Sequence, residues 1–108
     1  MFVLDKDVTS EVTENGVGRK VKGYLDDLMV VELHWKKDQV GALHRHPHRQ
    51  CTYVLSGAFE STVDDKKQVL HPGDCVYTAG DQLHGLVALE DGVILDIFTP
   101  IREDFLKK

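Results

Sequence analysis

The chain is built from short segments rich in Val, Ile, Leu, Tyr, Phe and Thr, separated by Gly, Pro and Asp. Short strands with turn residues at regular intervals are typical of all-β sandwiches and barrels. The sequence shows no long apolar period of the kind that indicates amphipathic helices. The pattern therefore predicts an all-β fold, and the length of 108 residues fits one domain with one hydrophobic core.

The expected strands follow from the apolar runs and the turn residues between them. They are Arg19–Leu25, Leu28–Trp35, Val40–His44, Gln50–Leu55, Ala58–Val63, Lys67–Leu70, Asp74–Thr78, His84–Leu89 and Val93–Thr99. A short helical turn is expected only in the tail, at Arg102–Lys107. Several strands, notably the run Val93–Phe98, are apolar at both parities, which predicts burial on both faces, in a filled barrel or against a second subunit.

Charge and hydropathy exclude several classes of partner. The net charge is −5 and the 13 basic residues are scattered, so the basic footprint of a nucleic-acid-binding protein is missing. No apolar run approaches the roughly 20 residues that span a bilayer. The first residues lack the pattern of a signal peptide, and we therefore expect a cytoplasmic protein with neither nucleic acid nor membrane as a partner.

The two cysteines, Cys51 and Cys75, lie far apart in the chain and form no CxxC pair, so no disulfide is expected. Cys51 follows Gln50 in a strand and should face the opposite side. We expect Cys51 to be a small buried hydrophobe, with a thiolate ligand or nucleophile as the alternative.

The histidines suggest a metal site. His44, His46 and His48 alternate immediately before a strand-forming run. In an extended chain, residues i and i+2 point to the same side, so His44 and His46 can direct two imidazoles to one point. Imidazole is the commonest protein ligand of transition metals. Because His48 follows Pro47 in the expected turn, we assign it a solvent-facing or supporting role.

At these residues the chain resembles the cupin family. The first cupin motif, HxH followed after three or four residues by Glu or Gln and six residues later by Gly, matches His44, His46, Gln50 and Gly57. The second motif matches Gly73 and His84 at the expected interval. The resemblance implies a cupin-type jelly-roll β-barrel.

The motifs are incomplete at four turn positions. Asp38 replaces the first glycine of the first motif, and Ala79, Asp81 and Ala88 replace the Pro, Gly and Asn of the second. These positions shape turns and supply no metal ligand.

The resemblance further implies a ligand set of His44, His46, Gln50 and His84 around one divalent transition metal. Mixed nitrogen and oxygen ligands suit Ni, Zn, Fe, Mn or Co, and the sequence leaves the choice among them open. With Gln rather than Glu the ligands carry no charge, which favours Lewis-acid chemistry on a bound oxygen. His34 and His71 are expected to be surface or turn residues.

A second group of candidate residues lies near the C-terminus. Asp96 interrupts an apolar strand on the same side as Ile94 and Phe98. A carboxylate buried without a partner costs several kcal/mol and tends to take up a proton. Arg102 follows just past Pro100 and can fold back over the mouth of a cavity. The alternatives are a catalytic pair and a structural Asp96–Arg102 ion pair.

The segment around Tyr53–Gly57 and the tail Leu95–Leu106 resemble small cupins of the pectin-degradation (KdgF) type. Those proteins convert 4,5-unsaturated uronates to the linear keto form, and their sites carry Asp, Phe and Arg at the spacing of Asp96, Phe98 and Arg102. The resemblance implies Asp96 as general acid/base, Arg102 as carboxylate-binding and catalytic residue, and Phe98 as an apolar wall. Gln50 is a candidate substrate contact as well as a metal ligand.

The resemblance thus implies a metal-dependent ring-opening enzyme acting on a small anionic sugar, and it also implies a homodimer. A non-catalytic, metal-loaded cupin that binds or senses a small carboxylate or sugar is the alternative from another class. An iron-dependent dioxygenase is permitted by the histidines, although no residue argues specifically for oxygen chemistry.

Overall fold

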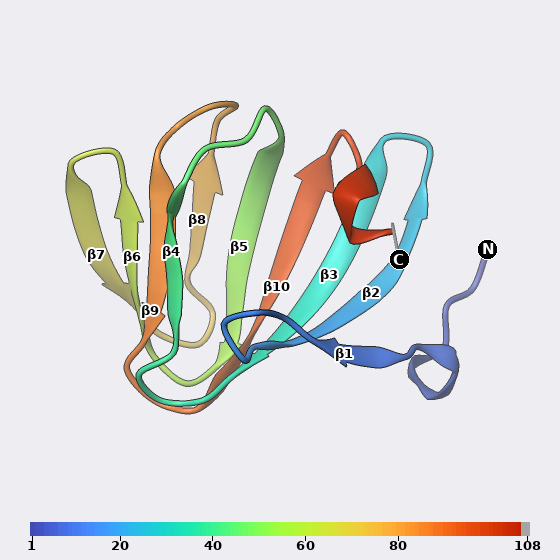
Figure 1. Ribbon diagram of the computed structural model, residues 1–108, viewed down its shortest axis with the longest axis horizontal. Helices are drawn as coiled ribbons and strands as arrows, with labels where there is room; N and C mark the ends of the chain where they lie inside the picture. Colours follow the sequence, from blue (N-terminus) through green and yellow to red (C-terminus); the bar gives the residue numbers. More distant parts are fainter. Residues whose placement is uncertain (107–108) are drawn as a thin grey trace.

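The computed structural model describes residues 1–106, which form two antiparallel β-sheets packed face to face (Figure 1). The strands are β1 (Ser10–Val12), β2 (Gly18–Leu25), β3 (Leu28–Trp35), β4 (Val40–His44), β5 (Arg49–Ser56), β6 (Phe59–Val63), β7 (Lys66–Leu70), β8 (Cys75–Thr78), β9 (His84–Ala88) and β10 (Gly92–Thr99). Two 3-10 turns are present, η1 (Asp5–Asp7) and η2 (Glu103–Phe105). Within residues 1–106, no helix is long and apolar enough to cross a membrane.

The six-stranded sheet has the order β1-β2-β3-β10-β5-β8, and the four-stranded sheet has the order β4-β9-β6-β7. From β3 onward the chain repeatedly crosses from one sheet to the other, which gives the jelly-roll arrangement (Figure 1). The predicted all-β jelly roll is therefore confirmed.

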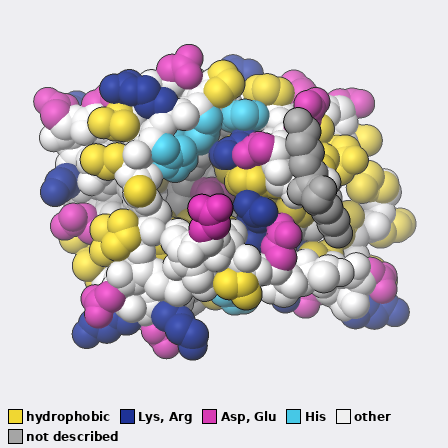
Figure 2. Space-filling model, viewed as in Figure 1, with side chains coloured by type: hydrophobic (Ala, Val, Ile, Leu, Met, Phe, Trp, Pro, Cys, Tyr) yellow, Lys and Arg dark blue, Asp and Glu magenta, His cyan; other side chains and the backbone are white. Residues whose placement is uncertain are grey.

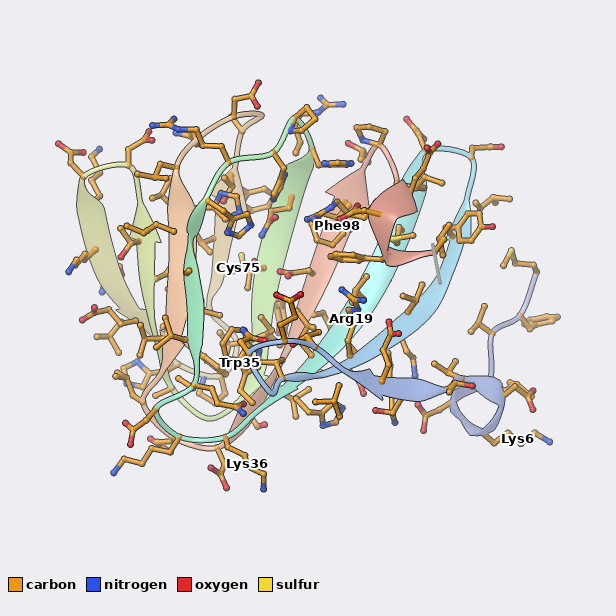
Figure 3. All side chains as sticks on the ribbon, viewed as in Figure 1. Lys6, Arg19, Trp35, Lys36, Cys75 and Phe98 are labelled. Atoms are coloured by element: carbon orange, nitrogen blue, oxygen red, sulfur yellow. The ribbon has the colours of Figure 1, made fainter. Side chains whose placement is uncertain are left out.

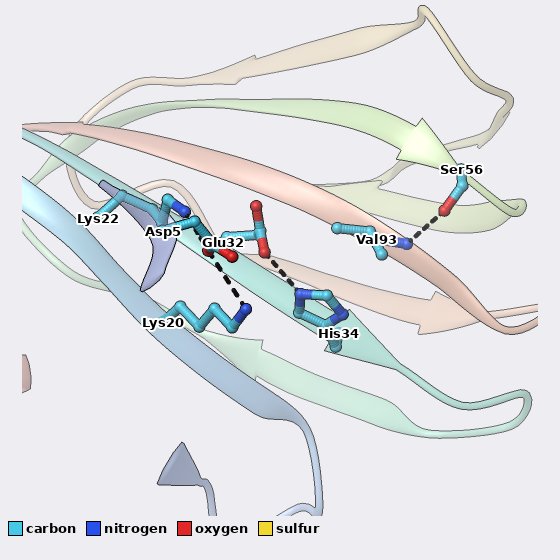
Figure 4. A network of polar contacts seen from close by, with 7 residues as sticks. All are labelled: Asp5, Lys20, Lys22, Glu32, His34, Ser56 and Val93. Atoms are coloured by element: carbon cyan, nitrogen blue, oxygen red, sulfur yellow. Dashed lines mark hydrogen bonds and ion pairs between the residues drawn. The ribbon is translucent and has the colours of Figure 1, made fainter. Parts of the chain in front are cut away.

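Each expected strand is present, with ends that agree to within one residue. The structure adds β1 and η1, which the sequence did not indicate because their residues are exposed and follow no apolar period. Tertiary contacts hold them instead. Ser10 of β1 pairs with Lys20 of β2, and Asp5 of η1 accepts hydrogen bonds from Lys20 and Lys22 (Figure 4).

The expected helical turn in the tail is found at η2, and Lys107 of the predicted range lies outside the described residues. The ring of Phe105 in η2 packs edge-on to Phe98, with 5.8 Å between centroids. This contact brings the tail back over the six-stranded sheet.

Inward-facing residues form the core between the sheets. Along β10, Gly92, Ile94, Asp96 and Phe98 are buried, whereas the residues between them are half-buried. The strand lies inside the six-stranded sheet, and the second sheet covers only one of its faces. The expectation that β10 is buried on both faces within a filled barrel is therefore wrong, and burial against a second subunit stays a prediction.

The apolar core fills one end of the sandwich. Trp35 and Phe59 meet edge-on at 5.8 Å between centroids, together with Val54 and Ile94. Beside this core, inward polar residues of β4, β5, β9 and β10 line a cavity between the sheets.

Two aspartates take over the turn geometry of the missing motif glycines. Asp38 has a φ of 73° and Asp81 a φ of 64°. Short polar side chains such as Asp tolerate this left-handed region better than most residues do. The turns next to the histidines are thus formed without the glycines.

We predict that Gly57→Ala destabilises the protein more than Gly73→Ala does. Both glycines have positive φ. A Cβ added at Gly57 would lie 2.5 Å from the backbone oxygen of Asp91, whereas a Cβ added at Gly73 would have no atom within 4 Å. The left-handed backbone alone costs about 1–2 kcal/mol, and the clash should raise the loss at Gly57 to about 2–4 kcal/mol. Urea unfolding of both variants measures the difference, and equal losses would contradict the steric argument.

Candidate metal centre and cavity

Three histidines converge between the sheets. His44 ends β4 and His84 begins β9, and the two residues are direct partners in the pairing of these strands. His46 reaches the same place from the loop that follows β4. One ring nitrogen from each of His44, His46 and His84 lies within 4.8 Å of the others, which suits a common metal ion.

The loop that carries His46 is fixed to the loop before β9. The backbone N–H of Asp81 donates to the carbonyl of His46 at 2.8 Å, and Arg45 donates from Nη1 to the carbonyl of Asp81 at 2.9 Å. The left-handed turn at Asp81 therefore helps to place His46 beside His84.

Backbone contacts determine which ring nitrogens are available. Nδ1 of His44 lies 2.8 Å from the carbonyl of Ala42, and Nδ1 of His84 lies 2.8 Å from the carbonyl of Gln82. Since a carbonyl can only accept, each Nδ1 carries a proton, and in the neutral ring the lone pair is then on Nε2. This arrangement is common for metal-ligating histidines.

The buried nitrogens of the group have no protein partner. Nε2 of His84 and both ring nitrogens of His46 are buried without a hydrogen bond among the residues that the structure describes. Leaving such atoms unpaired costs about 1–3 kcal/mol each, so a ligand is expected there. A divalent metal ion fits this set of donors.

His46 and His84 are also held in the neutral form that binds metals. Burial, the Arg102 guanidinium and the neighbouring imidazoles lower the pKa of His46 to about 4. Burial likewise lowers the pKa of His84. The hydrogen bond to Gln82 raises this pKa in part, and the nearby His44 and Arg102 lower it slightly further. Both rings are therefore in the neutral form, with one ring proton each, at neutral pH.

Gln50, the predicted fourth ligand, lines the same cavity as His44 and His84. Its side-chain Nε2 donates to the Thr52 hydroxyl at 3.1 Å, and that hydroxyl donates to the Asp96 carboxylate. Because the single hydroxyl proton goes to Asp96, the amide must present its NH₂ group to Thr52. The amide oxygen of Gln50 is then left for another partner, and its role as a metal ligand stays a prediction.

Asp96 lies in the wall of this cavity, directly opposite Thr52 in the pairing of β10 with β5. Asp96 is 8% exposed. Burial raises the pKa of Asp96 to about 6, and the Thr52 hydrogen bond and Arg102 only partly offset this effect. The carboxyl group therefore exchanges a proton near neutral pH, as a general acid or base does.

Arg102 lines the cavity but pairs with Asp104. Its Nε and Nη2 donate to the two carboxylate oxygens of Asp104 at 3.0 and 2.8 Å. Its guanidinium carbon lies 4.2 Å from the ring centroid of Phe105 and 5.3 Å from that of Phe98. Among the residues 1–106, Asp96 forms no ion pair with Arg102, so the alternative of a structural Asp96–Arg102 pair is wrong in this structure.

Phe98 is buried and stands between the tail and the histidines. Its ring lies edge-on to His46 at 6.1 Å and to His48 at 6.3 Å between centroids. His48 is half-buried, bonds through Nε2 to the carbonyl of Ile101 at 3.2 Å, and is outside the metal-binding group. His48 thus ties the histidine loop to the tail, in agreement with the predicted supporting role.

The other candidates lie away from the cavity. His34 is exposed and bonds to Glu32 at 2.6 Å (Figure 4), and His71 is exposed in a turn. Both agree with the surface roles expected. Cys51 is half-buried and Cys75 is exposed, both as free thiols. Full burial of Cys51 is not observed, because it faces the outer side of its sheet.

The cavity has a volume of about 250 Å³ and takes its walls from both sheets. Figure 2 shows histidines gathered at the rim of a hollow, with basic and acidic side chains across from them. Sequence reasoning missed Arg19 and the buried Thr52, and it left Trp35 open; all three line the cavity. Figure 3 labels Arg19 and Trp35. Arg19 lines the cavity, and Val21, two residues further along the same strand, packs against the core. This shared parity is the signal that could have revealed Arg19.

Comparison with protein families identifies the fold family. The cupin domain model matches residues 31–98, which include all three histidines, Gln50 and Asp96. This chain belongs to the cupin family. The predicted family is thereby confirmed, and the metal-suited histidine group agrees with it.

Relatives of this cupin are similar over nearly its whole length. It is 37% identical over 107 residues to the pectin degradation protein KdgF of Dickeya dadantii, covering 97% of each chain. The structure of KdgF from a Halomonas species matches with a TM-score of 0.92 and 36% identity, over 97% of this chain and 99% of that one. An RmlC-like cupin from Shewanella frigidimarina matches with a TM-score of 0.92 and 34% identity, over 96% and 94% of the two chains.

We predict that His46→Ala removes metal binding, whereas His71→Ala retains it. His46 belongs to the convergent group, and His71 is an exposed turn residue. The loss should exceed the 10- to 100-fold typical of an outer-shell partner, so we expect more than about 100-fold weaker binding. Calorimetric titration of metal-free protein with Zn²⁺ or Ni²⁺ measures this, and equal affinities of the two variants would contradict the assignment.

We predict that Asp96→Asn changes the pH dependence of stability. The folded protein holds the Asp96 proton at pH values where the unfolded chain has lost it, because the pKa of Asp96 is raised to about 6. The stabilising contribution is present at low pH and is lost as pH rises from about 4 to about 6.

A shift of roughly 2 pKa units corresponds to about 3 kcal/mol. The advantage of the Asn variant over metal-free wild type should therefore grow by about this amount between about pH 4 and about pH 8. Denaturant unfolding measures it, with Asp65→Asn in the exposed turn between β6 and β7 as control. A parallel pH dependence of wild type and Asp96→Asn would contradict the buried, proton-exchanging carboxyl.

Proposed function

We propose that this cupin is a metal-dependent enzyme that opens the ring of 4,5-unsaturated uronates and gives their linear keto form. The observation that supports it most is the buried carboxyl of Asp96, with a pKa raised to about 6, in one cavity with the three-histidine group and Arg102. A proton-exchanging carboxyl group, a cation and a metal-suited group are the parts that acid/base chemistry on a sugar acid requires.

The size of the cavity and the relatives support a small sugar acid as substrate. The volume of about 250 Å³ lies just below the 300–1,000 Å³ of typical drug-sized pockets, which favours a monosaccharide over a polymer. Two relatives carry the name KdgF, and one is described as a pectin degradation protein. Unsaturated uronates are small acids of the kind released during pectin and alginate breakdown.

The reaction is an isomerisation, so its protons must balance. The C1 hydroxyl loses a proton as the bond from C1 to the ring oxygen breaks, and the freed oxygen at C5 gains one to become an enol. A proton is then delivered to C4 while the enol hydroxyl loses its own, which leaves a keto group at C5. Asp96, protonated or ionised near neutral pH, is the residue that supplies and accepts these protons.

The other residues bind and orient the substrate. Arg102 is suited to the carboxylate, because the Nη1–Nη2 edge of its planar fork can donate two hydrogen bonds while Asp104 holds the other edge. Phe98 gives a flat apolar wall for the sugar face, and Gln50 offers its amide oxygen to a metal or to a substrate hydroxyl. When bound, a metal would supply Lewis-acid polarisation of a substrate oxygen.

We propose one divalent transition metal, among Ni, Zn, Fe, Mn and Co, held by His44, His46 and His84 with Gln50 as fourth ligand.

A homodimer is supported by the half-buried apolar residues Val93, Leu95 and Ile97 on the outer face of β10. Burying them against a second copy would remove apolar surface from water.

We predict that Asp96→Asn lowers turnover of unsaturated galacturonate by about 100- to 10,000-fold, the usual range for loss of a general acid/base. The loss of absorbance of the conjugated double bond follows the reaction. Metal content measured on the same samples should equal that of wild type, since Asp96 is outside the histidine group.

Asp65→Asn serves as the matched control and should retain wild-type turnover. Wild-type protein that binds the uronate saturably but leaves the double bond intact would contradict the enzyme and favour the ligand-binding alternative. Full turnover by Asp96→Asn would assign Asp96 a structural role.

A further inference from the structure

A second arginine faces the cavity, and the proposed reaction does not use it. Arg19 lies on β2 and lines the cavity together with Asp96 and Arg102 (Figure 3). Its side chain is only 20% exposed. An inward-facing cation between apolar residues is an unusual choice for a strand of a β-sandwich and calls for an anion.

Arg19 and Arg102 are held against the same aromatic ring. Each guanidinium carbon lies 4.2 Å from the ring centroid of Phe105, so the two cations lie within twice that distance of each other. Like charges placed this close repel, and the repulsion is larger in a partly desolvated cavity than in water. An anion that enters the cavity beside them relieves it.

The acids that now offset these charges, Glu11 and Asp104, are both exposed. Nε of Arg19 donates to Glu11 of β1 at 2.9 Å, and the Glu11 side chain is 45% exposed. Exposed ion pairs contribute about 0–1 kcal/mol, so a ligand can replace Glu11 at little cost. Within residues 1–106, the two Nη groups of Arg19 have no protein acceptor at hydrogen-bond distance, which leaves donors for a ligand.

We propose that Arg19 is a second carboxylate-binding residue of the cavity, which acts with Arg102 on the acid group of the sugar and selects acids over neutral sugars. Glu11 holds the Arg19 guanidinium in place until the ligand carboxylate takes it over. The inference rests on the proposed function for its substrate class, since a uronate carries the carboxylate that this pair requires.

The test is equilibrium binding of D-galacturonate and of its neutral methyl ester to the purified protein, measured by calorimetry. Wild type should bind the acid in preference to the ester. Arg19→Gln should weaken binding of the acid by about 10-fold or more, the effect of losing a hydrogen bond to a charged group, and leave the ester unchanged. Arg49→Gln, on the exposed part of β5, is the control and should bind as wild type does.

Glu11→Gln gives a second, independent test, because it removes the carboxylate that competes with the ligand for Arg19 and keeps Arg19 itself. Acid binding should tighten by about 2- to 5-fold. A structural role of the Glu11–Arg19 pair would weaken binding instead, and unchanged or weaker acid binding by this variant overturns the proposed role of Glu11.

Equal acid-to-ester preference in wild type and folded Arg19→Gln, or no acid binding by wild type, overturns the inference. Turnover measured in parallel separates it from the proposed function. Arg19-dependent acid binding without turnover would leave the inference standing and remove the enzyme. Turnover with an unchanged KM in Arg19→Gln would leave the enzyme standing and overturn the inference about Arg19.

Discussion

The pairing of β4 with β9 is the constraint on which the site depends. It sets His44 directly opposite His84 at the ends of the two strands, and the loop fixed by Asp81 adds His46. Backbone carbonyls accept hydrogen bonds from Nδ1 of His44 and His84, so Nε2 of each ring is available, and Nε2 of His84 is buried without a partner among the described residues. Buried nitrogens without a partner are unfavourable, and a bound cation would pair with them, so the fold produces a group that is suited to binding a metal ion.

A chain of hydrogen bonds runs from Gln50, which lines the same cavity as the histidines, to the proton-exchanging carboxyl. Gln50 donates to Thr52 and Thr52 donates to Asp96, all three from neighbouring strands of the six-stranded sheet. The same sheet isolates Asp96 from water and thereby raises its pKa. The position of Asp96, its raised pKa and its access to the cavity therefore have one cause, which is that alternate residues of β5 and β10 face inward.

The sequence predicted the strands and the histidine group well, because period-two alternation and residue spacing are local properties. The HxH pair, His84 and Asp96 all lie where these patterns indicated. Features held by long-range contacts were missed, such as β1, which forms only by pairing with β2. The Arg102–Asp104 pair was missed for a related reason, since the path of the tail decides whether Arg102 meets Asp96 or Asp104. Arg19 was overlooked because a lone arginine in a mixed strand is usually a surface residue.

The most direct test of the metal centre is an anomalous difference map from crystals of the protein loaded with a single transition metal. The account predicts one peak at coordination distance, about 2.0–2.2 Å, from ring nitrogens of His44, His46 and His84 and from the amide oxygen of Gln50. A peak elsewhere, or a map in which His84 points away from the other two histidines, would contradict it.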